Sequence, residues 1–357
     1  MTLSNSIEPH WIDAFQQLLL RCRAQPGETA AILAESQSRA DLVESLRHAC
    51  ARLGLQTFVL MLNTPSQPSA TPIIRSTGAS AAIAGIAPVV GALAASNWVL
   101  DCTVEGLMHA PELPSILQGH GQTQPRVIYI SNEHPEALSR LLPDEQLEQS
   151  VKAHMKRVRS AKLMRVHSAA GTDLRIQLEG APSGGNWGYS NRAGSMTHFP
   201  GGLVLAFPRA GSVSGRLVLA AGDVNLAFKR YIEQAVTLTI EADYITRIEG
   251  AGVDAQLMRE YWAAWEQRDG HRACYAVSHV GYGLNPAARF DSMAMFDKRD
   301  FNGTELRAAA GSFLYSTGAN ETAGRYTLGH FDLPMKHCTV LLDEQTVVQE
   351  GRLVATS

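Results

Sequence analysis

The sequence has few cysteines, and they form no recognisable motif. The five, Cys22, Cys50, Cys102, Cys274 and Cys338, are an odd number and lie far apart in the 357-residue chain. A disulfide framework needs paired cysteines, and a thiolate zinc cluster needs closely spaced ones such as Cys-x-x-Cys. The sequence therefore argues against both, and a reducing cytoplasm is the expected location.

The chain also lacks an excess of charge of either sign. It has 31 basic and 34 acidic side chains, which gives a net charge of −3. No stripe of basic residues alternates with aromatic residues in the way that is typical of nucleic-acid-binding surfaces. Binding to nucleic acid is therefore not expected.

No segment is suited to secretion or to a membrane. Residues Met1 to Ser6 do not form a charged region that leads into an apolar core, so no secretory signal is predicted. Ala79 to Ala95 carries no charge, but it is rich in alanine and glycine, contains Pro88 and is short of the roughly 20 strongly apolar residues of a membrane span. We interpret it as a buried helix and loop packed on a sheet.

The first 158 residues alternate between apolar strands and amphipathic helices. Helices are predicted at Glu8–Gln25, Ser38–Leu53 and Asp144–Val158, and strands at Thr29–Ala34, Leu55–Leu62, Trp98–Cys102 and Arg126–Ser131. Such an alternation predicts an α/β domain with an open, mostly parallel sheet over residues 1–158. Neither Gly-x-Gly-x-x-Gly nor Gly-x-x-x-x-Gly-Lys-Ser/Thr occurs, so the usual dinucleotide and phosphate sites are not indicated.

The remaining residues, 159–357, read as short strands of alternating polarity. Strands are predicted at Lys162–Ser168, Asp173–Leu178, Gly202–Phe207, Gly215–Ala220, Ala235–Ile240, Tyr244–Glu249, Arg272–Ser278, Cys338–Leu342 and Val347–Val354, and a helix at Met258–Arg268. This pattern predicts an α+β domain with a largely antiparallel sheet. Gly180 to Gly202 is glycine-rich and contains Trp187, Arg192 and His198, so we expect a long functional loop.

The segment from Ser316 to Met335 contains the most unusual chemistry. If Arg325 to Leu333 is extended, His330 and Asp332 project from the same face of a strand, with Phe331 on the other face. Such a pair can bind one metal ion. It can equally be a hydrogen-bonded pair in a half-buried strand, and spacing alone does not decide between the two.

His279 offers a third ligand. It follows the predicted strand Arg272–Ser278 and opens the glycine-rich run Val280 to Pro286, which is expected to end the strand in a tight turn. Two imidazoles and one carboxylate make the facial arrangement that is typical of non-haem Fe(II), with positions left open for substrate and dioxygen. Zinc uses the same groups, so ligand type does not settle the metal.

His109 lies just beyond the carboxyl end of the predicted strand Trp98–Cys102. Ligands of open α/β sheets bind at this end of the strands. His109 is therefore either a proton-transfer group that reaches a cleft or a solvated loop histidine.

Four segments together carry a resemblance to a known family. They are Asp101–His109, Asn186–Gly202, His279–Pro286 and Ser316–Met335, and the Gly-His-Phe-Asp-Leu-Pro block in the last is the most specific. They resemble the 2,5-dihydroxypyridine 5,6-dioxygenases, Fe(II) enzymes that cleave the ring in bacterial nicotinate and nicotine degradation. The resemblance implies a leucyl aminopeptidase (aminopeptidase T)-like fold and an iron bound by His279, His330 and Asp332. It also suggests His109 and His198 as catalytic residues beside the metal, and a homo-oligomer is expected.

The metalloaminopeptidases that share this fold hold two metal ions. They place a glutamate ligand shortly after a Pro-Gly-Gly-like turn, whereas here Pro200-Gly201-Gly202 is followed by Leu203. An apolar side chain cannot bind a metal, so one iron is the better interpretation. A two-metal aminopeptidase and a non-catalytic small-molecule binding protein remain the alternatives.

The resemblance implies a reaction of a small aromatic N-heterocycle with dioxygen, which opens the 5,6 bond of 2,5-dihydroxypyridine to give N-formylmaleamate. His109 or His198, with an ordinary pKa near ~6.5, would accept the proton of the substrate hydroxyl. Arg307 and Ser316 are candidates for hydrogen bonds to the substrate oxygens. The alternatives are a surface salt bridge for Arg307 and a turn cap for Ser316.

Overall fold

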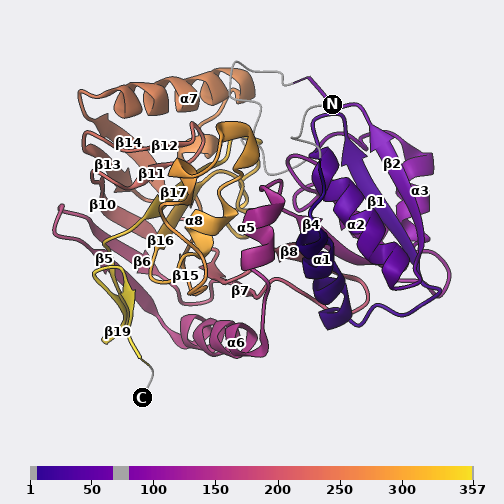
Figure 1. Cartoon of the computed structure of the whole chain (residues 1–357). Helices are drawn as coiled ribbons and strands as arrows, with labels where there is room; N and C mark the ends of the chain where they lie inside the picture. Colours follow the sequence, from indigo (N-terminus) through magenta and orange to yellow (C-terminus); the bar gives the residue numbers. More distant parts are fainter. Residues whose placement is uncertain (1–5, 67–79, 356–357) are drawn as a thin grey trace.

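The computed structural model describes residues 6–66 and 80–355 of the chain. Figure 1 shows an N-terminal half in indigo and purple beside a larger C-terminal half that runs from magenta to yellow. All five cysteines are buried and none is in a disulfide. In the described part of the chain, no helix has the length and apolar character needed to cross a bilayer.

The N-terminal half is built on one parallel sheet, as predicted. Its strands are β1 Thr29–Glu35, β2 Gln56–Leu62, β3 Trp98–Asp101, β4 Arg126–Ile130 and β8 Ser195–Phe199, in the order β2-β1-β3-β4-β8. Its helices are α1 Pro9–Arg21, α2 Ala40–Arg52, α3 Ala87–Ala94, α4 Leu113–Gln118 and α5 Pro135–Arg140. Separate apolar clusters fill the two faces of the sheet, because parallel strands with crossover helices are covered on both sides.

The uncharged segment that begins at Ala79 is less buried than predicted. Ala79 itself lies outside the described residues, and the helix within the segment, α3, packs only one side on the sheet. Ile86, just before it, is 38% exposed, whereas Leu93 is fully buried. A helix on the surface of a sheet needs only one apolar stripe, and alanine and glycine tolerate water on the other side.

The C-terminal half contains antiparallel sheets, again as predicted. The larger sheet has the order β14-β13-β10-β6-β5-β18-β19-β20, and the smaller has the order β17-β16-β15-β9-β7. The bounds are β5 Leu163–His167, β6 Asp173–Gln177, β7 Ser183–Asn186, β9 Leu203–Ala206, β10 Val213–Leu219, β13 Val236–Glu241, β14 Tyr244–Glu249, β15 Val277–Gly283, β16 Phe313–Thr317, β17 Phe331–Met335, β18 Thr339–Leu342, β19 Gln345–Gln349 and β20 Arg352–Leu353, with a separate pair β11 Val224–Asn225 and β12 Arg230–Tyr231. One large apolar core lies between these sheets and their helices.

The described residues of this half form three α-helices: α6 Glu145–Ser160, α7 Val253–Asp269 and α8 Thr304–Ala308. In Figure 1, α7 lies above the strands and α6 below them. Trp262 and Trp265 of α7 are fully buried in the large core. The short helix α8 matters for the site because it carries Arg307.

The prediction of one long loop from Gly180 to Gly202 is wrong. The segment contains two strands, β7, which pairs with β9, and β8, which adds a fifth strand beside β4 in the N-terminal sheet. The chain therefore returns to the N-terminal sheet after residue 159. The domain boundary between residues 158 and 159 stays a prediction. β8 follows this boundary in the sequence but belongs to the N-terminal sheet.

The predicted strand Arg272–Ser278 is displaced along the chain. Ala273–Tyr275 forms a 3₁₀ turn, and the strand β15 begins at Val277 and continues through the glycine-rich run that was expected to end it. A Cβ atom on Gly281 would lie 2.0 Å from the carbonyl oxygen of Val204 on the neighbouring strand. The glycine therefore permits close strand packing instead of a turn.

A buried histidine links α6 to the sheet and makes stability depend on pH. The Nδ1 atom of His154 lies 3.0 Å from the hydroxyl of Tyr282 on β15. Burial lowers the pKa of His154 to about 4 from the ordinary 6.5. The unfolded chain therefore binds an extra proton between these values, so stability is full above pH 6.5 and falls as the pH drops toward 4.

His154→Gln keeps a hydrogen-bonding group that does not titrate. Between pH 7 and pH 4, the free energy of unfolding of this variant should fall by up to about 3 kcal/mol less than that of the parent. Urea unfolding at a series of pH values measures this difference. His48→Gln, at an exposed helical histidine of α2, is the matched control and should follow the parent profile. Parallel pH profiles for all three proteins would contradict the assignment.

Candidate functional site

Three neighbouring strands of the smaller sheet place the candidate residues in one row. Ser316 on β16 pairs directly with Asp332 on β17. Between β15 and β16 the register shifts, because Val277 pairs with Thr317 and Val280 with Tyr315. Two residues of β15, Ser278 and His279, therefore lie opposite the single residue Ser316 of β16. This extra residue in one strand is a β-bulge, and bulges beside active sites redirect side chains. The bulge brings His279 into the row of Ser316 and Asp332.

His330 lies one residue before β17, so the strand is shorter than predicted. The alternation nevertheless holds: Phe331 packs on Tyr261 and Trp262 in the core, on the side opposite to Asp332. The Tyr261 hydroxyl accepts from the backbone N–H of His330 at 3.0 Å and donates to its carbonyl oxygen at 2.8 Å. A buried phenol therefore fixes the backbone from which the His330 side chain projects.

The three predicted ligands come together. One ligand atom from each of His279, His330 and Asp332 lies within 4.8 Å of the other two. Asp332 Oδ1 is 3.1 Å from His330 Nε2 and 3.8 Å from His279 Nε2, and the two imidazole rings stack with centroids 5.5 Å apart. Two nitrogens and one oxygen that converge in this way can bind one divalent transition metal.

The tautomer of His279 is set by its neighbour Ser278. The Ser278 hydroxyl donates its one proton to the carbonyl oxygen of Ala319 at 2.6 Å, and its oxygen lies 3.1 Å from His279 Nδ1. The serine oxygen must therefore accept from Nδ1–H, which leaves the lone pair of Nε2 facing Asp332. Burial lowers the pKa of His279 to about 3, against the opposing effect of Asp332. The imidazole is thus neutral and ready to bind a metal.

Ser278→Ala is expected to weaken metal binding about 10- to 100-fold, because Nδ1–H loses the group that holds the ring and its tautomer. Anaerobic titration with Fe(II) measures the affinity. Ser45→Ala removes an equally buried serine hydroxyl from α2 and should leave the affinity unchanged. Equal affinities in the two variants would show that Ser278 does not position the ligand.

Asp332 has two further partners, and both were predicted as substrate-binding residues. Arg307 forms an ion pair with Asp332 Oδ2, and the Ser316 hydroxyl donates to Oδ1. Burial raises the pKa of Asp332, but the charges of His330 and Arg307 outweigh it and hold the pKa well below its usual range. Arg307 is buried, so the surface salt bridge considered for it is wrong, and its contact with substrate stays a prediction.

A chain of polar contacts runs from Asp332 to His198. Arg307 also donates to the hydroxyl of Thr304 at 2.9 Å, and Thr304 lies 3.4 Å from Nε2 of His198. The His198 ring packs against Tyr129 of β4, with centroids 4.8 Å apart. His198 on β8 is therefore connected to the carboxylate of Asp332, a predicted metal ligand, through two side chains.

Glu133, which the sequence analysis did not identify, holds the helix that carries Arg307. Its carboxylate accepts from the backbone N–H groups of Asn302 at 2.7 Å and Thr304 at 2.9 Å, and it is almost fully buried. Glu133 follows β4 of the N-terminal half, whereas α8 belongs to the C-terminal half. The sequence feature that could have indicated Glu133 is its position just after the carboxyl end of a predicted strand. The same feature indicated His109.

His109 lines a cavity of ≈1050 Å³ that His330 also lines. The other lining residues include Phe207 and Pro182 and the exposed side chains Met108 and Tyr326. The loop that carries His109 is ordered by buried Asp101, which accepts from the N–H groups of Thr103 and Leu107. His109 is exposed, and it lines the same cavity as His330, a predicted metal ligand.

Among the described residues, no second group of three or more histidine, cysteine or carboxylate side chains converges in this way. Within residues 6–66 and 80–355, the group His279, His330 and Asp332 includes no fourth histidine, cysteine or carboxylate. Leu203 lies on β9, is buried and pairs with Gly283 of β15. The donor set therefore fits one metal ion.

Comparisons with known proteins agree over the length of the chain. A family model described as 2,5-dihydroxypyridine 5,6-dioxygenase matches residues 10–355. A 2,5-dihydroxypyridine 5,6-dioxygenase of Pseudomonas putida is 32% identical over 344 residues, covering 96% of this chain and 95% of that protein. The solved structure of 2,5-dihydroxypyridine dioxygenase from Pseudomonas putida KT2440 superposes with a TM-score of 0.88, at 32% identity and 97% coverage of both chains. Wild-type AmpT from Thermus thermophilus, at 15% identity, TM-score 0.57 and coverage of 97% of this chain and 99% of that one, shares the fold.

Proposed function

Because the chain belongs to the family of 2,5-dihydroxypyridine 5,6-dioxygenases, we propose that it cleaves the ring of 2,5-dihydroxypyridine with dioxygen at one Fe(II) held by His279, His330 and Asp332. The family resemblance, the dioxygenase class and the aminopeptidase-like fold predicted from the sequence are confirmed. The observation that carries the proposal is the convergence of two imidazoles and one carboxylate beside a cavity.

The donor set supports iron but is not specific to it. Two neutral imidazole nitrogens and a carboxylate on one side of an ion are typical of non-haem Fe(II) sites. When bound, Fe(II) supplies a Lewis acid for a hydroxypyridine oxygen and a redox partner for dioxygen. A cavity of ≈1050 Å³ is slightly larger than the roughly 300–1,000 Å³ that is typical of ligand sites, so a small ring and dioxygen both fit.

The side chains around the site divide into two roles. His109 lines the cavity with His330, and we assign it to accept the proton of the substrate hydroxyl. His198 contacts Thr304 instead, so we assign it to position Arg307 and through it Asp332. Ser316 and Arg307 orient the carboxylate of Asp332, and we also propose them as hydrogen-bond partners of the substrate oxygens.

Further parts of the proposal rest on the family resemblance. The product is N-formylmaleamate, the reaction belongs to bacterial nicotinate or nicotine degradation, and the enzyme is a homo-oligomer. Five free, buried cysteines support a cytoplasmic location, where thiols stay reduced.

Anaerobic reconstitution with Fe(II), followed by oxygen uptake with 2,5-dihydroxypyridine, tests the function. We expect one iron per chain and one dioxygen consumed per substrate. The two-metal aminopeptidase predicts two ions per chain and peptide hydrolysis without oxygen, and a non-catalytic binding protein predicts neither tight metal binding nor oxygen uptake. Either of those results would overturn the proposal.

A further inference from the structure

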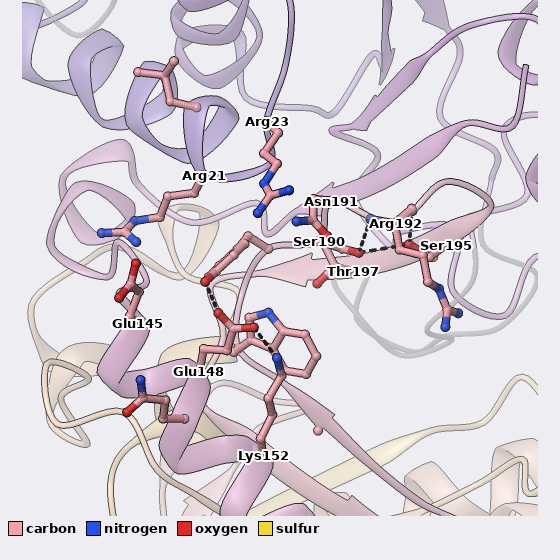
Figure 2. Close-up of a pocket in the computed structure, with 16 residues that line it drawn as sticks. Arg21, Arg23, Glu145, Glu148, Lys152, Ser190, Asn191, Arg192, Ser195 and Thr197 are labelled. Atoms are coloured by element: carbon pink, nitrogen blue, oxygen red, sulfur yellow. Dashed lines mark hydrogen bonds and ion pairs between the residues drawn. The ribbon is translucent and has the colours of Figure 1, made fainter.

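A second cavity, of ≈980 Å³, lies between the end of α1, the start of α6 and the connection from β7 to β8 (Figure 2). It shares no lining residue with the cavity beside His330. Neighbouring residues of β8 face the two sites, because Thr197 lines this cavity whereas His198 contacts Thr304. The two cavities are therefore separate, and the dioxygenase reaction does not account for this one.

The cavity has more cations than its carboxylates neutralise. Arg21, Arg23, Lys152 and Arg192 line it together with only Glu145 and Glu148. Glu148 is already occupied, since it accepts from Lys152 and from the Tyr189 hydroxyl. Figure 2 shows Arg21 directed toward Glu145 and Arg23 directed into the space above Glu148. Within the described residues, Arg23 forms no ion pair with a carboxylate.

The backbone at Arg23 gives an independent indication. Arg23 ends α1 in the left-handed conformation, with φ 60°, and donates its N–H to Leu20, while Ala24 donates to Leu19. This is the Schellman helix end, in which glycine is strongly favoured at the left-handed position. The helix end is less stable with arginine at this position than it would be with glycine. Arginine supplies a guanidinium group that glycine lacks, which indicates a role for that group.

The other walls fit a flat, unsaturated anion. Trp187 lies under the ammonium of Lys152, with 5.0 Å from Nζ to the ring centroid, and Tyr189 forms a second aromatic wall. Asn191 and Thr197 add neutral polar groups. We propose that this cavity binds a small planar organic carboxylate, with Arg23 as the principal cation and the aromatic rings as the surface that the ligand packs on.

Calorimetric titration of the iron-loaded full-length protein with maleate, under anaerobic conditions, tests the proposal. We expect saturable binding that Arg23→Gly weakens about tenfold or more, since a charged hydrogen bond is lost. The same substitution should leave the thermal midpoint unchanged or raise it by about 1–2 °C, because glycine suits the helix end. Weakened binding in an equally stable protein separates a ligand role from a structural one.

Two further variants and a second ligand make the test decisive. Arg175→Gln removes an exposed charge from β6, outside the cavity, and should bind maleate as the parent does. His330→Ala should also retain binding, because the metal site is not involved. No saturable binding, parent-like binding by Arg23→Gly, or loss of binding in His330→Ala would each overturn the proposal. Inorganic phosphate that binds as tightly as maleate would overturn the assignment to a planar carboxylate.

Discussion

Replacing His330 by alanine is expected to abolish iron binding and ring cleavage while the protein stays folded. The change removes one of three ligands. Loss of a group that only hydrogen-bonds to a ligand lowers metal affinity roughly 10- to 100-fold, so loss of the ligand itself should lower it further. Folding should persist because Tyr261 holds the backbone of residue 330, not its side chain, and Asp332 keeps Arg307 and Ser316 as partners. Iron content, oxygen uptake and urea unfolding measure the three outcomes.

His337→Ala is the matched control. His337 lies just after the same strand, β17, and its side chain is exposed, so iron content and oxygen uptake should equal those of the parent. Full iron content in His330→Ala would remove this residue from the ligand set. Unfolding of that variant with no change in metal affinity per folded molecule would instead assign His330 a structural role.

The pairing of His330 with Asp332 was predictable because it depends only on local geometry. Residues two apart in extended chain share a face, whichever strand lies beside them. The prediction therefore survived an error in the bounds, since β17 begins at Phe331 and not at Arg325. Burial of Phe331 against α7 fixes which face the other two residues take.

The position of His279 depends on contacts that spacing does not encode. Its orientation follows from a bulge, which exists only because β15 pairs with β16 in a shifted register. Ser278, which sets its tautomer, likewise acts through the distant carbonyl of Ala319. His279 does lie in the cluster with His330 and Asp332, and its role as a ligand stays a prediction. The predicted strand end and glycine turn around it were wrong.

The connection from Gly180 to Gly202 was misjudged for a related reason. Ser183 to Asn186 contains two glycines and no β-branched residue, so its intrinsic preference for a strand is low. It becomes β7 because β9 supplies hydrogen-bonding partners, and β8 forms because β4 has a free edge. Tertiary pairing overrides local preference at β7, and His198 reaches the site because β8 pairs with β4.

Replacing Arg307 by methionine is expected to destabilise the metal-free protein by about 3–5 kcal/mol, because the buried carboxylate of Asp332 loses its cationic partner. A bound metal ion provides a second positive charge beside that carboxylate, so the metal-loaded variant should lose less. The stabilisation that metal confers should therefore be larger in the variant than in the parent. By linkage, the variant should also bind the metal more tightly.

Urea unfolding with and without metal measures this difference, and Arg325→Met is the matched control. Arg325 and Asp243 form another buried pair, at 2.8 Å, in which the carboxylate is not a candidate ligand. Arg325→Met should destabilise the metal-free and metal-loaded proteins equally. A similar result for Arg307→Met would contradict the coupling of Arg307 to the metal.

Steady-state kinetics of Arg307→Met separate the two roles of Arg307. A higher KM for 2,5-dihydroxypyridine indicates that Arg307 contacts the substrate. A lower kcat at constant KM indicates that Arg307 only orients Asp332.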